Sequence, residues 1–165
     1  MKVPLSWLRE WVDLTLPIDE LVHRLNLSGT EVENVIRVDA EWEGVYVAEV
    51  VGLERHPQAD TLNLARLDVG NQGLATVVTG AANLQVGARV PLVRPGGRLP
   101  GGRQIGAEAL RGVLSEGMLC SGDELGLSPD RSGIYVLDGA AAAAVGRPLG
   151  DVLGDTVLDL SLIHI

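Results

Sequence analysis

The chain has 165 residues, of which 46% are hydrophobic and 21% charged, a balance typical of a folded globular protein and not of a disordered one. Its formal net charge of −9 at pH 7 argues against a protein that binds nucleic acid through overall charge, and its single cysteine excludes an intramolecular disulfide. No apolar run approaches the roughly 20 residues that cross a bilayer, and the first residues lack the apolar region of a secretory signal. We therefore expect a cytoplasmic protein without membrane contact.

Two short helices are predicted at the amino end. Pro4 suits the first turn of a helix, and Trp7 and Trp11 follow it at helical spacing. Pro17 opens the second helix, and Ser28-Gly29 ends it. We interpret the two tryptophans as core or interface anchors and not as groups that stack on bases, because acidic residues surround them.

The composition changes after an acidic connector at residues 39 to 43. From Gly44 to about Asp138, short β-rich runs alternate with Gly, Pro and Asn, a spacing typical of a small antiparallel barrel with five or six strands. The strand-like runs are Val45 to Leu53, Asn63 to Val69, Ala75 to Thr79, Val90 to Val93 and Ile134 to Leu137.

The segment from Arg111 to Leu127 alternates polar and apolar residues between glycines, as neither an ordinary helix nor an ordinary strand does. We predict a folded loop that plugs or crosses the barrel, with glycines supplying positive φ or close approach. The glycine pairs at 96–97 and 101–102 predict a hairpin-like loop. A phosphate-cradling loop is the less supported alternative, because no Lys-Ser/Thr and no helix follow.

The runs Glu31 to Val38 and Thr156 to Leu162 both alternate as strands do, and we expect them to pair. The predicted fold class is therefore α+β with an inserted all-β barrel, a five- or six-stranded OB-type barrel within a small split α+β domain. The predicted domains are 1–39 for the first part of the split domain, 40–150 for the barrel and 151–165 for the start of the returning part. A partly built domain exposes an edge, so we expect a truncated chain.

The acidic average hides an uneven distribution of charge. Residues 44 to 120 hold seven Arg against six Asp and Glu, so the acidic excess lies in the flanks. Five arginines fall in one window that only Glu108 opposes, namely Arg89, Arg94, Arg98, Arg103 and Arg111. A locally basic face on an acidic protein can attract phosphates while the remaining surface discourages indiscriminate binding. Solvated loop arginines without a ligand are the alternative interpretation.

Four blocks carry specific residue patterns. They read His56-Pro57-Gln58-Ala59-Asp60-Thr61-Leu62, Leu67-Asp68-Val69-Gly70, Thr76-Val77-Val78-Thr79-Gly80-Ala81-Ala82-Asn83 and Leu110-Arg111-Gly112-Val113-Leu114-Ser115-Glu116-Gly117-Met118-Leu119-Cys120. These blocks resemble the tRNA-binding oligonucleotide-barrel family. With the flanks Ser6-Trp7-Leu8 and Ser28-Gly29-Thr30-Glu31-Val32-Glu33, nearly the whole chain resembles the amino-terminal part of bacterial phenylalanyl-tRNA synthetase beta subunits.

Two departures from the family pattern stand out. The family's third strand commonly ends Val-Cys-Gly-Ala-Pro-Asn, whereas this chain has Val-Thr-Gly-Ala-Ala-Asn at 78–83, a change that leaves the bend intact. After Ser161 the family continues Ile-Thr-Pro-Asn-Arg, whereas this chain reads Leu162-Ile163-His164-Ile165. From the second departure we expect a truncated or artificial terminus after Ser161.

Three further residues join the five arginines as candidates for RNA binding. His56 is predicted to be a turn residue or an RNA contact and not a catalytic group, because no second titratable partner stands at fixed spacing. The Asn83 amide either meets a sugar or base edge or stabilises its turn. Ser115 either caps a short turn or contacts phosphate. Cys120 is expected to be a buried, unreactive residue, and no catalytic residue or metal ligand is predicted.

The resemblance implies a non-catalytic part of a ligase. It implies tRNA binding and subunit assembly in the ATP-dependent charging of tRNA with phenylalanine, with a synthetase alpha subunit as partner in an alpha2beta2 heterotetramer. Magnesium and ATP would act in the full enzyme, and no cofactor is expected in this chain. A freestanding tRNA-binding barrel without a ligase partner is the alternative. A hydrolase finds no nucleophile, base and orienting group at usable spacing.

Overall fold

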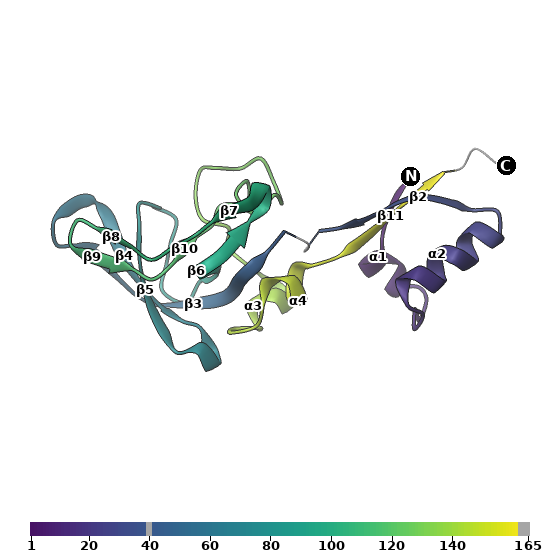
Figure 1. Cartoon of the computed structure of the whole chain (residues 1–165). Coiled ribbons are helices and arrows are strands. Elements are labelled where there is room, and N and C mark those ends of the chain that lie inside the picture. Colours follow the sequence, from purple (N-terminus) through teal and green to yellow (C-terminus); the bar gives the residue numbers. More distant parts are fainter. Residues whose placement is uncertain (39–40, 162–165) are drawn as a thin grey trace. The chain divides into compact units, whose positions relative to one another are not determined.

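A computed structural model describes residues 1–38 and 41–161 of the chain. The protein is mostly β, with a few short helices (Figure 1). Its internal contacts divide the chain into two compact units. Unit 1 combines Met1–Ala40 with Gly154–Ile165, and unit 2 is the continuous stretch Glu41–Leu153.

The helices of unit 1 begin directly after prolines, as predicted. Helix α1 is Leu5–Arg9 and helix α2 is Ile18–Leu27, with Pro4 and Pro17 as the residues that precede them. Gly29 takes a φ of 92° after α2, and the Thr30 N–H donates to the Leu25 carbonyl at 3.0 Å. Glycine suits this position because it adopts the left-handed conformation that ends a helix without a side-chain clash.

The sheet of unit 1 joins the two ends of the described chain. Its three strands are β1 (Lys2–Pro4), β11 (Thr156–Ser161) and β2 (Glu31–Arg37), in the order β1-β11-β2 and antiparallel throughout. The predicted pairing of the runs at 31–38 and 156–162 is confirmed over the described residues, while Leu162 lies outside them. Trp7 and Trp11, expected to be anchors, are both exposed in unit 1.

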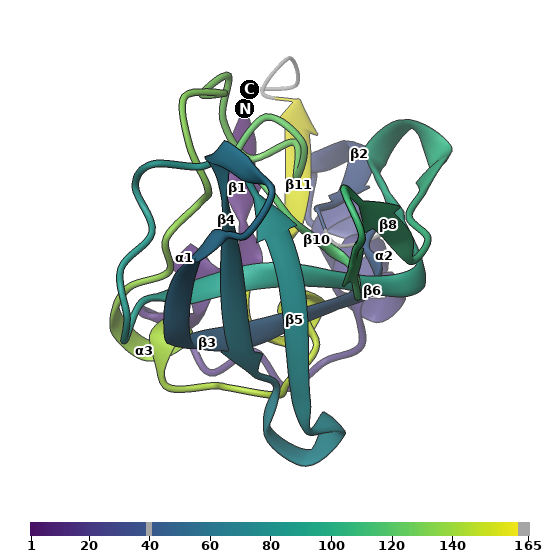
Figure 2. The same cartoon turned by 90° about the vertical axis from the view of Figure 1, so that its left-hand side faces the viewer.

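Unit 2 contains a six-stranded antiparallel sheet with β3 between β4 and β6. Its main path is β10-β6-β3-β4-β5 (Figure 2), and β7 pairs with β6 beside that path. The strands are β3 (Glu43–His56), β4 (Ala59–Asp68), β5 (Leu74–Thr79), β6 (Arg89–Leu99), β7 (Arg103–Gln104) and β10 (Met118–Leu119). Four of the five predicted strand runs are confirmed. Within residues 41–153, no strand ladder joins β5 to β10, so barrel closure is not shown.

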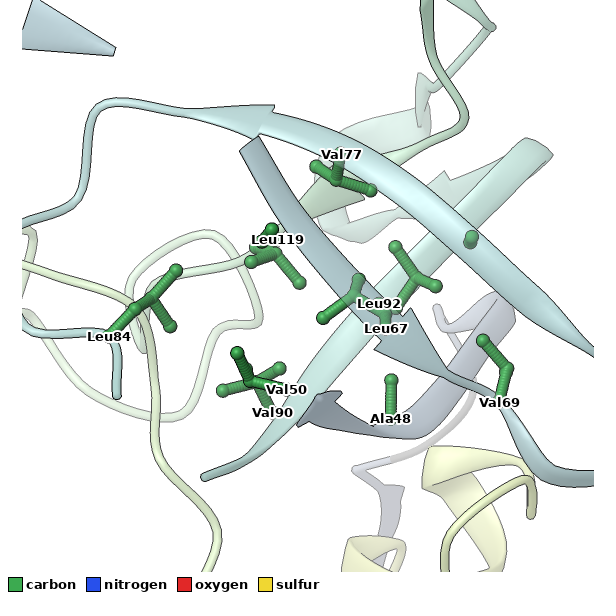
Figure 3. Close-up of a cluster of buried hydrophobic side chains, with 11 residues drawn as sticks. Ala48, Val50, Leu67, Val69, Val77, Leu84, Val90, Leu92 and Leu119 are labelled. Atoms are coloured by element: carbon green, nitrogen blue, oxygen red, sulfur yellow. The ribbon is translucent and has the colours of Figure 1, made fainter. Parts of the chain in front are cut away.

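The main core of unit 2 lies on one face of this sheet. Alternate residues of neighbouring strands supply it, because side chains of a strand point in turn to opposite faces. Val50, Leu67, Val77 and Leu92 are all fully buried there and converge from four strands, and Leu119 of β10 adds to them (Figure 3).

Strands β3 and β6 are buried on their second face as well. Val47 of β3 and Val93 of β6 belong to a second core cluster that includes Leu125, Leu137 and Leu149. Leu149 belongs to helix α4 (Leu149–Leu153), which follows the short helix α3 (Gly139–Ala142). Burial on both faces explains the nearly continuous apolar run at the start of β3.

The glycine-rich segment at 111–127 is only partly the loop that was predicted. It contains β9 (Val113–Ser115) and β10, and β9 forms a hairpin with β8 (Glu108–Leu110). The prediction of a folded loop missed these strands, because each spans only two or three residues. The hairpin predicted at 96–102 is confirmed, as β6 turns into β7 through the 3-10 helix η2 (Pro100–Gly102). A second such helix, η1 (Gly70–Gln72), lies between β4 and β5.

The predicted strand at 134–137 is wrong. Its backbone bonds go to three different segments and not to one neighbouring strand. The Ile134 N–H donates to the Asn83 side chain, the Tyr135 N–H to the Cys120 carbonyl and the Leu137 N–H to the Arg89 carbonyl. Only the last of these belongs to a β-bridge. This apolar segment therefore packs on the core without forming a strand, and it meets the sheet through the Leu137–Arg89 bridge.

Candidate nucleic-acid interface

Three of the five predicted arginines are paired with carboxylates. Arg89 lies 3.0 Å from Glu49 across the β3–β6 ladder, and Arg98 lies 3.9 Å from Glu43. Arg103 lies 3.4 Å from Glu124. Exposed pairs of this kind contribute about 0–1 kcal/mol to stability, so they order the side chains more than they stabilise the fold. They also reduce the positive charge that a basic face would present to phosphates.

Arg94 and Arg111 form no ion pair within the described residues. Arg94 is partly buried on β6, and its Nη1 atom has no hydrogen-bond partner there. Arg111 is exposed in the two-residue turn of the β8–β9 hairpin. Its φ of 48° and the Gly112 φ of 87° are both positive, as a type I′ turn requires. Such a turn holds the Arg111 side chain at the tip of the hairpin.

His56 and Ser115 attach this hairpin to the sheet. His56 is only 4% exposed, and its Nδ1 accepts from the Gln58 N–H at 3.0 Å while Nε2 lies 3.0 Å from the Leu110 carbonyl. Because Nδ1 accepts, Nε2 carries the proton and donates to Leu110. Ser115 is 3% exposed, accepts from the Val78 N–H at 3.1 Å and donates to the Gly117 carbonyl. Both side chains therefore have structural partners, and their proposed RNA contacts stay predictions.

Asn83 also has two structural partners. Its Nδ2 donates to the Ile134 carbonyl at 2.9 Å, and its Oδ1 accepts from the Ile134 N–H at 3.0 Å. The side-chain amide of Asn83 therefore exchanges two hydrogen bonds with the backbone of Ile134, as a paired residue of a neighbouring strand would. Gly133 permits this approach, because a Cβ there would lie 2.6 Å from the Asn83 oxygen. An RNA contact by Asn83 is untested.

Two of the predicted residues, Arg103 and Ser115, border hollows of unit 2. One hollow of about 550 Å³ lies at the end of β5 against the segment 121–134, and a neighbouring hollow of about 250 Å³ lies between β5, β7 and β10. Arg103 lines both of them. The larger hollow also contains Arg131, whose guanidinium is 2.8 Å from the Asp123 carboxylate.

A capping box orders the wall of the larger hollow. The Ser121 N–H donates to Glu124 Oε2 at 2.9 Å, and the Glu124 N–H donates back to Ser121 Oγ at 3.3 Å. Nearby, hydrogen bonds from the side chain and backbone of Ser132 lower the pKa of Asp130 below its ordinary value. Burial raises the pKa of Cys120 to about 12, with Glu124 acting in the same direction and Arg103 against it.

Residues 45–146 match a known family described as a putative tRNA binding domain. The chain belongs to this family. The match to the tRNA-binding domain contains all eight predicted RNA-binding residues and Arg131 as well. Strands β1, β2 and β11 of unit 1 lie outside it.

Curated relatives match both units. The chain is 43% identical over 164 residues to the phenylalanine–tRNA ligase beta subunit of Symbiobacterium thermophilum and 44% identical over 164 residues to that of Anaeromyxobacter dehalogenans. These matches cover 98% of this chain but 18% and 20% of the relatives, so the chain spans about a fifth of their length. The chain is homologous to the amino-terminal region of these subunits.

Among solved structures, the C-terminal domain of Plasmodium vivax p43 is 22% identical, with a TM-score of 0.46 over 66% of this chain and 59% of that chain. A TM-score at this level supports no argument about the fold.

Sequence reasoning missed Arg131 because it lies beyond the arginine window. The sequence does indicate an ordered turn shortly before Arg131, because Ser121 and Glu124 have the spacing of a capping box. Across residues 1–38 and 41–161, no cluster of three or more His, Cys, Asp or Glu side chains is arranged to hold a metal ion. No helix in the described part of the chain is long and apolar enough to span a membrane.

Proposed function

We propose that this chain is the tRNA-binding and assembly portion of a phenylalanine–tRNA ligase beta subunit. One observation carries the proposal, namely identity of 43% that extends over 98% of the chain and so includes unit 1 as well as the tRNA-binding domain. A freestanding tRNA-binding protein would need only the domain at 45–146. The flanking sheet of unit 1 therefore favours the ligase subunit over that alternative.

The finer fold that accompanies this proposal is an OB-type barrel. The antiparallel order β10-β6-β3-β4-β5 supports it, since β3 has neighbours on both sides and begins the unit. Contacts of β9 and β10 with β5 bring the two ends of the sheet near each other. In such a barrel, loops and one sheet face bind oligonucleotides.

The proposed whole enzyme acts in the cytoplasm. Its alpha subunit would complete an alpha2beta2 heterotetramer, and ATP and magnesium would serve the charging reaction outside this chain. Copurification of the chain with a tagged alpha subunit tests the assembly role. A stable complex with one mole of each chain supports it, and separate elution of the two chains under conditions where each is folded contradicts it.

Binding of tRNA by the chain tests the tRNA-binding role. We expect weak binding that falls steeply with salt, because Lys and Arg release counterions when they neutralise phosphates. Replacing Arg94 and Arg103 together by Ala should reduce the salt slope by about one unit for each phosphate that the variant no longer neutralises. Fluorescence anisotropy with labelled tRNA at several salt concentrations measures the slope. An affinity that does not respond to salt contradicts the basic-face mechanism.

A further inference from the structure

The two hollows of the tRNA-binding domain lie on either side of one arginine. Arg103 lines both, and the last residues of β5 continue from Val78 in the smaller hollow to Thr79 in the larger. The hollows are therefore neighbouring parts of one cleft. We call it the Arg103 cleft.

The walls of the two hollows differ in chemistry. The smaller one has apolar walls from Val78, Ile105, Leu110 and Met118. Its polar side chains, besides Arg103, are Gln104, Glu108 and Ser115. Its volume of about 250 Å³ is below the range of about 300–1,000 Å³ that is usual for whole small-molecule ligands, so it suits a single ring system. The larger hollow has mainly polar walls, including Arg131.

The Arg103 guanidinium is oriented yet still has donors to offer. Nη1 lies 3.4 Å from Glu124, and Nη2 lies 3.7 Å from the sulfur of Met118, a weak acceptor. The side chain is 59% exposed. Because a guanidinium carries five N–H groups in one plane, these two contacts fix its position and leave a fork for a phosphate.

The carboxylates beside Arg103 are themselves engaged. Glu124 accepts from the backbone N–H and hydroxyl of Ser121, and Asp123 is paired with Arg131. Ser121 and Arg131 thus partly compensate the negative charges of Glu124 and Asp123, and both belong to the protein. Glu124 and Asp123 therefore compete less with a phosphate at Arg103, and the exposed Glu108 in the wall of the smaller hollow is the further carboxylate that the phosphate meets.

We propose that the Arg103 cleft binds unpaired RNA, with one phosphate on Arg103 and the adjoining base in the smaller hollow. The inference rests on the proposed tRNA-binding function and adds to it a site and a class of ligand. A base in a paired helix is stacked and cannot enter a hollow of this size, whereas a base in a loop or at an end can be splayed out.

The test uses the 165-residue chain and oligouridylate or oligoadenylate of about five nucleotides, measured by competition with labelled tRNA. Arg103→Ala should weaken oligonucleotide binding about tenfold. Arg147→Ala is the matched control, because Arg147 is 61% exposed, has a carboxylate partner at 3.9 Å and lines neither hollow. It removes the same charge and should weaken binding less than twofold.

A second variant blocks the base site without changing charge. A Cβ at Gly106 would have no heavy atom within 4 Å, so Gly106→Trp has room for its first side-chain atoms at the wall of the smaller hollow. We expect it to weaken oligonucleotide binding about tenfold, whereas Gly106→Ala should bind as the unchanged chain does. Circular dichroism checks that each variant is folded.

The outcomes separate this inference from the proposed function. Equal losses of oligonucleotide binding in Arg103→Ala and Arg147→Ala contradict the proposed binding site in the cleft, even if tRNA still binds. Normal binding by folded Gly106→Trp contradicts it as well. Oligonucleotide binding that depends on Arg103 and Gly106 supports the cleft even if intact tRNA fails to bind. Competition by an RNA duplex as strong as that by the oligonucleotides also overturns it.

Discussion

Gly117 and Gly101 both have positive φ, but only Gly101 has room for a side chain. A Cβ at Gly117 would lie 2.2 Å from the Val93 carbonyl oxygen, whereas a Cβ at Gly101 would have nothing within 4 Å. Gly117→Ala must therefore separate β10 from β6, while Gly101→Ala adds only backbone strain. We expect Gly117→Ala to lower the free energy of unfolding by at least about 2 kcal/mol more than Gly101→Ala does. Urea denaturation of both variants measures this, and equal losses would show that the close approach is unimportant.

Cys120 should react slowly with a thiol reagent until denaturant is added, because it is fully buried and its pKa is raised to about 12. An unfolded thiol ionises near its ordinary value of 9.0, while the folded thiol stays protonated. This contribution to stability is therefore complete below pH 9 and is lost as the pH rises towards 12. Unfolding free energies of the chain and Cys120→Ala should converge over that range. A constant difference, or fast labelling of the native chain, contradicts the assignment.

The β8–β9 hairpin is the element whose position depends on a few hydrogen bonds. Besides the His56 and Ser115 contacts, the Glu116 N–H donates to the Thr76 carbonyl at 2.9 Å. Ser115→Ala would leave the buried N–H of Val78 without its acceptor, which costs about 1–3 kcal/mol. Ser132→Ala, at an exposed serine, should change stability by less than about 0.5 kcal/mol. Thermal unfolding compares them, and hydrogen exchange at Val78 should rise only in Ser115→Ala.

On the scale of the whole molecule, the domain boundaries stay a prediction that proteolysis can test. Sequence composition predicts cleavage first near residues 39–43 and within 140–150. Unit 2 extends to Leu153, and Leu149 is fully buried, so the second cut should fall outside α4. Mass spectrometry should detect a resistant fragment that begins near residue 41. Early cleavage within β3 to β6 would contradict both boundaries.

Alternation along the sequence predicted the pairing of β2 with β11, and β-rich runs between turn residues predicted the long strands of unit 2. It failed at β9 and β10, which are only two or three residues long, and the partner of β10 is the distant strand β6. The basic face was predicted from the arginine window. The positions of the arginines in the sequence cannot show that Glu124 forms an ion pair with Arg103, or Glu49 with Arg89. Arg103 and Arg131, each paired with its own carboxylate, line the same hollow only because of the fold, so the local sequence does not indicate the cleft.

The central position of β11 in the sheet of unit 1 has a consequence for synthesis on the ribosome. Strand β1 has β11 as its sheet neighbour, and β2 pairs with the same strand, although more than a hundred residues separate β2 from β11 in sequence. The first two strands must therefore wait, unpaired, while unit 2 is translated. Folding of unit 2 during that interval shortens the loop that the last strand has to close, because a compact insert brings its own ends within reach. Translation order thus makes the middle of this protein fold before its beginning.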